Sequence, residues 1–240
     1  MSNQFGLSHV KQLTEIQEAR NRHGQPGIGR EVEELIRRLT SGGVAGKSNG
    51  LREARAKRLW DVGIGKDVGC SDFASYLAGI PEIPAALAED DADFPLLVLV
   101  EPRIGLARLC ERAGVALSGD DETFIACDEA HHEFTQPAWI RIQDGRKNRG
   151  RNVIDCRQSF HVDERGLTAL QGVCAYVQHP EMVGDALSPD AQLLDLPGSI
   201  PRAFPRNAAW LAVWHGRPEL CWRWVGGADS KCGSASRRER

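Results

Sequence analysis

The chain has 240 residues, of which 41% are hydrophobic and 26% are charged, and its formal net charge is −3 at pH 7. These values are ordinary for a globular protein that buries a sizeable core, as one large domain or two small ones. They give no support to a strongly basic nucleic-acid binder, and the longest apolar run, residues 94–100, is far too short to span a bilayer.

The cysteines and the first residues indicate the compartment. Seven cysteines are scattered along the chain, an odd number, and no CxxC pair occurs. This spacing favours reduced thiols over a disulfide framework or a zinc site. Residues 1–20 hold no apolar core behind a basic end, so the sequence predicts no signal peptide. We therefore expect a cytoplasmic protein with no membrane partner.

The first third of the chain has the periodicity of helices. Apolar side chains recur at helical spacing, and capping residues and glycines mark the ends, over residues 5–22, 29–40, 51–62 and 71–77, the last with Ser71 as N-cap. We expect residues 1–80 to form a helical N-terminal unit. The acidic stretch that follows, 81–95, is typical of a linker or a long surface loop.

Residues 94–240 mix strand and helix signals. The wholly apolar run Leu96–Val100 predicts a strand buried on both faces, and the alternation over 138–143 predicts another strand. Helices are expected over 106–113 and 167–178. Together with a C-terminal hairpin, these elements predict an α+β fold.

The hairpin over residues 207–225 carries much of the chain's aromatic area. Two runs of alternating residues flank a Gly/Pro turn, and they contain Trp210, Trp214, Trp222 and Trp224. We expect Trp222 and Trp224 to pack inward, and Arg223 to reach solvent or an acidic partner. The sequence leaves open whether the tryptophans form core or a binding surface.

Two familiar motifs are present only in part. Residues 41–48 end in Gly-Lys-Ser, but Ser41 stands where a phosphate-binding loop has its first glycine, and a predicted helix precedes it. Residues 65–77 have the outline of a helix-turn-helix, yet the second helix carries no Lys or Arg for DNA. A flexible connector and a pair of packed helices are the better interpretations.

The densest group of possible metal ligands lies between residues 127 and 133. Cys127 and His131 are four residues apart and His132 follows, so a helix would place the first two on one face. No second cluster with ligand spacing accompanies them, and nothing in the sequence activates the thiol as a nucleophile. We therefore expect no metal and no cofactor, with these three residues as the weak candidates.

An arginine-rich segment is the best candidate for anion binding. Residues 141–157 contain six basic residues against two acidic ones. Guanidinium groups recognise phosphates and carboxylates, so a cleft could be lined by Arg146, Arg149, Arg151, Arg157 and Arg217. Alternatively the segment pairs with the acidic stretches 82–93 and 120–133, and this pairing is favoured because exposed charges usually have such partners.

Several short motifs in the second half resemble an uncharacterised bacterial family, a domain of unknown function. They include Gly216-Arg217-Pro218-Glu219-Leu220 with Trp222-Arg223-Trp224, and the run 233–236, GSAS. The resemblance covers about residues 94–238. It implies no activity, because no catalytic or binding residue is established for that family.

Three classes of function stay open on this sequence. A binding or interaction module is favoured, since no catalytic constellation stands out. A small-molecule enzyme that acts on an anionic substrate through the arginine segment is the first alternative. Nucleic-acid association is the second, through residues 11–58, which hold eleven bases against six acids.

Overall fold

We describe a computed structural model of the chain, for residues 48–128, 131 and 134–239. The chain divides into two units, Met1–Arg52 and Glu53–Arg240. Residues 53–80, predicted to belong with the N-terminal helices, thus fall in the second unit. The helices predicted over 5–22 and 29–40, and the loop-like residues 41–47, lie outside the described residues.

The described residues form short helices and many short strands. Residues 48–61 are helical, and the further helices are α3 (Ile64–Asp67), α4 (Phe73–Ala78), α5 (Ala85–Ala88), α6 (Leu106–Ala113), α7 (Val153–Ser159) and α8 (Ala169–Gln178). Single 3-10 turns are η1 (Pro102–Ile104), η3 (Arg146–Asn148) and η4 (Pro180–Met182). The strands are β1 (Leu96–Val100), β2 (Ala116–Leu117), β3 (Phe124–Ala126), β4 (Ala138–Gln143), β5 (Glu164–Gly166), β6 (Leu193–Leu196), β7 (Ser199–Pro201), β8 (Asn207–Trp214), β9 (Arg217–Trp224), β10 (Cys232–Ser234) and β11 (Ser236–Arg238).

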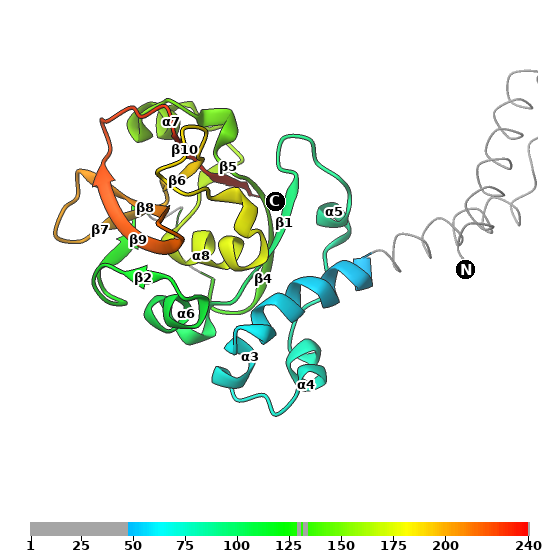
Figure 1. The fold of residues 1–240 in the computed structure, drawn as a ribbon. Coiled ribbons are helices and arrows are strands. Elements are labelled where there is room, and N and C mark those ends of the chain that lie inside the picture. Colours follow the sequence, from blue (N-terminus) through cyan, green and yellow to red (C-terminus); the bar gives the residue numbers. More distant parts are fainter. Residues whose placement is uncertain (1–47, 129–130, 132–133, 240) are drawn as a thin grey trace, which may run out of the picture. The chain divides into compact units, whose positions relative to one another are not determined.

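Two sheets enclose the buried helix α8. One has the strand order β1-β4-β11-β5, the other β10-β6-β8-β9-β2, and β3 and β7 form a separate pair. Helix α8 packs against β1 of the first sheet and β8 of the second, between the two sheets in Figure 1. At Gly172 it approaches β6 so closely that an added Cβ would lie 2.4 Å from Leu196 Cδ2. The predicted α+β fold is confirmed.

The predicted hairpin is present as β8 and β9. The strands pair antiparallel from Asn207↔Trp224 to Trp214↔Arg217. His215 (φ 51°) and Gly216 (φ 74°) alone form the turn, both in the left-handed region that a type I′ hairpin turn requires. A tight turn of this kind fixes the register, and so the face of the sheet on which each tryptophan lies.

The prediction for the hairpin side chains is wrong at Trp224, whereas Arg223 has the acidic partner that was predicted for it as one of two possibilities. Trp224 is 62% exposed, because it lies at the end of β9, opposite Asn207. Arg223 is only 19% exposed and pairs with Asp195 of β6, whose side chain is fully buried. The reason is that α7 covers this face of the sheet, where its Val153 packs with Ala208 beside Arg223. Because α7 shields the guanidinium group from most of the solvent, Arg223 pairs with a buried carboxylate.

Other local predictions are confirmed in outline and corrected in detail. Helix α4 begins one residue later than predicted, because Asp72 rather than Ser71 is the N-cap and shares a capping box with Ser75. The acidic stretch 81–95 is held against the first sheet by Arg141, which donates to three backbone carbonyl oxygens, at Leu87, Glu89 and Pro95. Within the described residues, no helix is long and apolar enough to cross a membrane.

Candidate functional site

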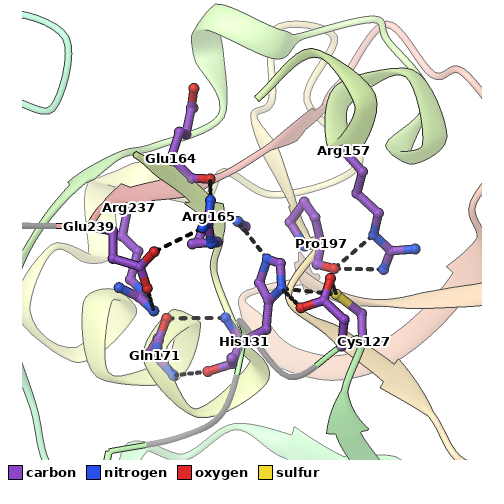
Figure 2. Close-up of polar contacts among 12 residues, drawn as sticks. Cys127, His131, Arg157, Glu164, Arg165, Gln171, Pro197, Arg237 and Glu239 are labelled. Carbon is purple, nitrogen blue, oxygen red and sulfur yellow. Dashed lines mark hydrogen bonds and ion pairs between the residues drawn. The ribbon is translucent and has the colours of Figure 1, made fainter. Parts of the chain in front are cut away.

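The predicted Cys/His cluster does come together, with one ligand atom more than expected. His131 Nδ1 lies 2.7 Å from Asp128 Oδ1 and 3.3 Å from Cys127 Sγ. The three ligand atoms lie within 4.8 Å of one another, a spacing that could hold a metal ion. The imidazole is buried, at 7% exposed, and Figure 2 shows it between Cys127 and the strand that carries Arg165. His132, the third predicted candidate, lies outside the described residues.

The other ring nitrogen of His131 decides what this cluster can do. The backbone N–H of Gly166 donates to His131 Nε2 over 3.1 Å, so Nε2 is the acceptor nitrogen and Nδ1 carries the proton. A metal ion can bind Nδ1 only if that nitrogen has no proton. The neutral ring would then carry its proton on Nε2, directly opposite the Gly166 N–H. Two donors would then face each other inside the protein. The arrangement therefore favours a histidine that anchors β5 over a histidine that binds a metal.

The same geometry opposes nucleophilic catalysis by Cys127. A catalytic histidine uses one nitrogen for the nucleophile and the other for the orienting carboxylate. Here Nδ1 faces both Cys127 and Asp128, and Nε2 is bound to the backbone. Burial also raises the pKa of the Cys127 thiol to about 11, so little thiolate forms near neutral pH.

Three of the five candidate arginines bind protein carbonyl oxygens and side chains. Arg149 donates to the carbonyls of Ser230 and Ala191. Arg157 donates through two nitrogens to the carbonyl of Pro197, at 2.9 and 2.6 Å, as drawn in Figure 2, and burial lowers its pKa. Arg151 donates to the Asp155 carbonyl, Asn148 Oδ1 and Ser159 Oγ. These guanidinium groups hold loops together.

The remaining two candidates are more exposed. Arg146 forms an ion pair with Asp144 at 2.6 Å, and its side chain is 62% exposed. Arg217 lines a surface hollow beside the hairpin turn, with Trp214 and Glu219. The anion-binding cleft lined by all five arginines stays a prediction.

The alternative pairing with the acidic stretches is found at two points. Lys147 lies 3.2 Å from Asp93, and Arg141 lies 3.8 Å from Asp90. Both partners belong to the stretch 82–93, and the start of the second stretch, residues 120–123, has another neighbourhood.

That neighbourhood is an aromatic hollow which the sequence analysis did not single out. The rings of Phe204 and Trp222 stack at 5.5 Å with an interplanar angle of 23°, and Phe124 meets Trp222 edge-on at 6.1 Å. The hollow beside them has a volume of about 420 Å³, and besides Trp222 its walls are residues 119, 120, 122, 123 and 201–204. Phe204 is 50% exposed, although a ring of this size is usually buried.

The ends of several strands create this hollow. Strand β7 ends at Pro201, the chain then turns at 202–206, and Phe204 lies between Pro201 and Pro205 in the sequence. Trp222 comes from β9, on the sheet face of Leu220 and Leu211. Phe124 comes from β3, which pairs with β7. The advance signals were Trp222, which the sequence left open as core or binding surface, and the run 201–205, a phenylalanine in a proline-flanked turn.

Charges are arranged at the rim of the hollow. Asp120 Oδ1 accepts from the backbone of Glu122 and from Thr123 Oγ1, which closes the turn after β2. Arg202 donates through Nε to the Glu122 carbonyl at 3.3 Å. The Glu122 carboxylate is exposed and makes no hydrogen bond or ion pair with the described residues. The hollow thus has an apolar floor and a charged rim, where the carboxylates of Asp120 and Glu122 outnumber the guanidinium of Arg202.

Comparisons of the chain with protein-family models, with curated proteins and with solved structures find no match.

Proposed function

We propose that this protein is a binding protein that takes an apolar side chain of a partner into the hollow between Phe204 and Trp222. The observation that carries the proposal is the stacked pair of rings, one half-exposed, open to a hollow of about 420 Å³. Exposed aromatic side chains in concave sites are the residues that dominate binding energy at protein interfaces.

The position of the hollow supports the proposal. Its rings are fixed from three different strands or strand ends, so the binding surface exists before any ligand arrives. Pre-organised aromatic side chains lose little conformational entropy on binding. The resemblance to the uncharacterised bacterial family over about residues 94–238 includes Trp222, and a cytoplasmic location suits free thiols at all seven cysteines.

The two alternative functions have less support. An enzyme for anionic substrates would need free guanidinium groups, and Arg149, Arg151 and Arg157 bind protein oxygens instead. Nucleic-acid association would rest on residues 11–58, most of which lie outside the described residues.

A peptide selection tests the proposal. Immobilised protein is used to enrich peptides from a displayed library of random twelve-residue sequences, and the enriched peptides are then measured against two variants. Phe204→Ser removes the exposed ring, and Leu187→Ser is the matched control, since Leu187 is 56% exposed in another loop. Loss of one aromatic anchor typically costs more than about 1.4 kcal/mol, which is tenfold in affinity.

The expected result is that the enriched peptides bind Phe204→Ser at least about tenfold more weakly than the parent, and bind Leu187→Ser like the parent. Failure to enrich any peptide contradicts the proposal, as does equal binding to both variants.

A further inference from the structure

The outer edge of β9 next to the hollow has a free strand position. We infer that the partner segment is an extended peptide that adds to the second sheet along this edge, beyond Leu220. It carries a bulky apolar residue for the hollow and a basic residue for the rim. This inference rests on the proposed function and adds the binding mode and the chemistry of the partner.

Strand β9 is covered along only part of its outer edge. On its inner side it pairs with β8 over all eight residues, Arg217–Trp224. On its outer side the two residues of β2 pair with Glu219 and Leu220 alone. The N–H of Ser118 donates to the Leu220 carbonyl at 2.9 Å, and the chain then turns away at Gly119 (φ 110°). Figure 1 shows β2 beside the start of β9.

The alternation of a β-strand gives the direction of the next backbone groups. In an antiparallel pair, successive residues point their N–H and C=O alternately toward the partner strand and away from it. Because the Leu220 carbonyl points to β2, Cys221 and Arg223 point to β8, and Trp222 points outward again. No strand of the described structure pairs with this outward side of Trp222. Among the described residues, no backbone carbonyl accepts from the Trp222 N–H, and the acceptor beside it is the sulfur of the preceding Cys221, a weak one.

The open edge and the hollow share one residue. Trp222 offers its backbone to the edge and its ring to the hollow, so an added strand would run directly past the aromatic pair. Recognition by strand addition uses this combination, in which main-chain hydrogen bonds give affinity and a side-chain pocket gives specificity. The hollow of about 420 Å³ has room for a phenylalanine or leucine side chain.

The acidic residues at the rim favour a basic peptide as the added strand. Asp120 and Glu122 line the hollow together with Arg202, and Asp121 lies between the two acids in the sequence; all three acids are exposed. The carboxylate of Asp121 accepts from the Ala107 N–H at 2.6 Å, and Glu122 keeps its carboxylate free among the described residues. A second copy of this chain, paired edge to edge, would bring these acids near their own copies, which is unfavourable. A peptide with lysine or arginine two residues from its apolar anchor places that charge on the anchor's face, next to Glu122.

Capped peptides of the pattern Lys-Thr-Phe-Thr-Lys are the probe. They are titrated into the ¹⁵N-labelled full-length protein, and binding is measured from backbone amide shifts. Two analogues carry N-methyl groups, one at phenylalanine and the other at both threonines. In an extended peptide the N–H group of the phenylalanine and those of the threonines point to opposite sides, so only one of these two groups of N–H can face β9. Strand addition therefore predicts that one analogue binds at least about tenfold more weakly and the other binds like the parent peptide. The Trp222 amide should show the largest shift.

A charge variant tests the rim. Glu122→Lys should weaken the lysine peptide at least about fivefold, and Asp190→Lys, an exposed acid in another loop, should leave binding unchanged. Equal binding of both N-methyl analogues would overturn strand addition, yet leave the hollow as the binding site if Phe204→Ser still abolishes binding. Library peptides that bind at Phe204 while no lysine peptide binds at millimolar concentration would overturn the basic partner. Failure of every peptide would remove the proposed function as well.

Discussion

Replacing Arg223 by alanine should destabilise the protein strongly. Arg223 Nε lies 2.6 Å and Nη2 lies 3.0 Å from the two carboxylate oxygens of Asp195, and Nη2 also donates to the Gly227 carbonyl at 3.1 Å. Asp195 has no exposed surface. Arg223→Ala therefore leaves a buried carboxylate without its counter-charge, which costs about 3–5 kcal/mol of unfolding free energy.

A substitution of the partner, Asp195→Asn, should lower the free energy of unfolding by less. Asp195→Asn leaves an amide oxygen that can still accept from Arg223, and the guanidinium retains some contact with water and with Gly227. We expect a loss of about 1–2 kcal/mol, the usual value of a weakened hydrogen bond in a buried site. Arg217→Ala, at the exposed start of the same strand, is the control and should lie within about 0.5 kcal/mol of the parent.

The pH dependence gives a second check on Arg223→Ala. Burial raises the pKa of Asp195, and Arg223 opposes that rise. Without Arg223 the folded-state pKa rises further above the unfolded value, so the penalty is greatest at neutral pH. It is relieved as the pH falls through the folded-state pKa, because the folded protein then takes up a proton. Urea unfolding at several pH values measures this. A loss below about 1 kcal/mol at pH 7, or a loss that grows on acidification, would refute the reasoning.

Three further predictions concern other parts of the fold. Two arginines hold the pKa of the Asp67 carboxyl well below its ordinary value of 3.8, so Asp67→Asn should lower the melting temperature at pH 7, and the difference from the parent should shrink as the pH falls below about 4. Purified untagged protein should contain no stoichiometric zinc by elemental analysis, because Gly166 fixes the His131 tautomer; zinc that is lost on His131→Ala would contradict this. Thiol titration in denaturant should find all seven cysteines free, and a reproducibly missing pair would show a disulfide.

Periodicity predicted the regular elements because each depends on residues near in sequence. The apolar run Leu96–Val100 is β1, with its last four residues buried, and the alternation over 207–225 is the hairpin. Such patterns follow from the spacing of side chains along a strand, whatever lies nearby. The two-residue turn at His215-Gly216 likewise follows from local backbone preferences.

Contacts between segments that lie far apart in the chain could not be predicted from the sequence. Arg223 meets Asp195 because β6 and β9 both flank β8, and no spacing in the chain announces that strand order. The hollow is hidden for the same reason, since Phe124, Phe204 and Trp222 come from three separate segments. Conversely, Cys127 and His131 could be paired from their spacing, but the hydrogen bond from Gly166 that fixes the histidine could not.

Amide hydrogen exchange along β9 tests the central claim most directly. In the free protein, the Trp222 amide should exchange fast, and the amides of Cys221 and Arg223, which point to β8, should exchange slowly. Saturation with the lysine peptide should slow exchange at Trp222 and leave Cys221 and Arg223 unchanged. A Trp222 amide that is already protected in the free protein, or one that stays fast when the peptide is bound, would contradict an open strand position at this edge.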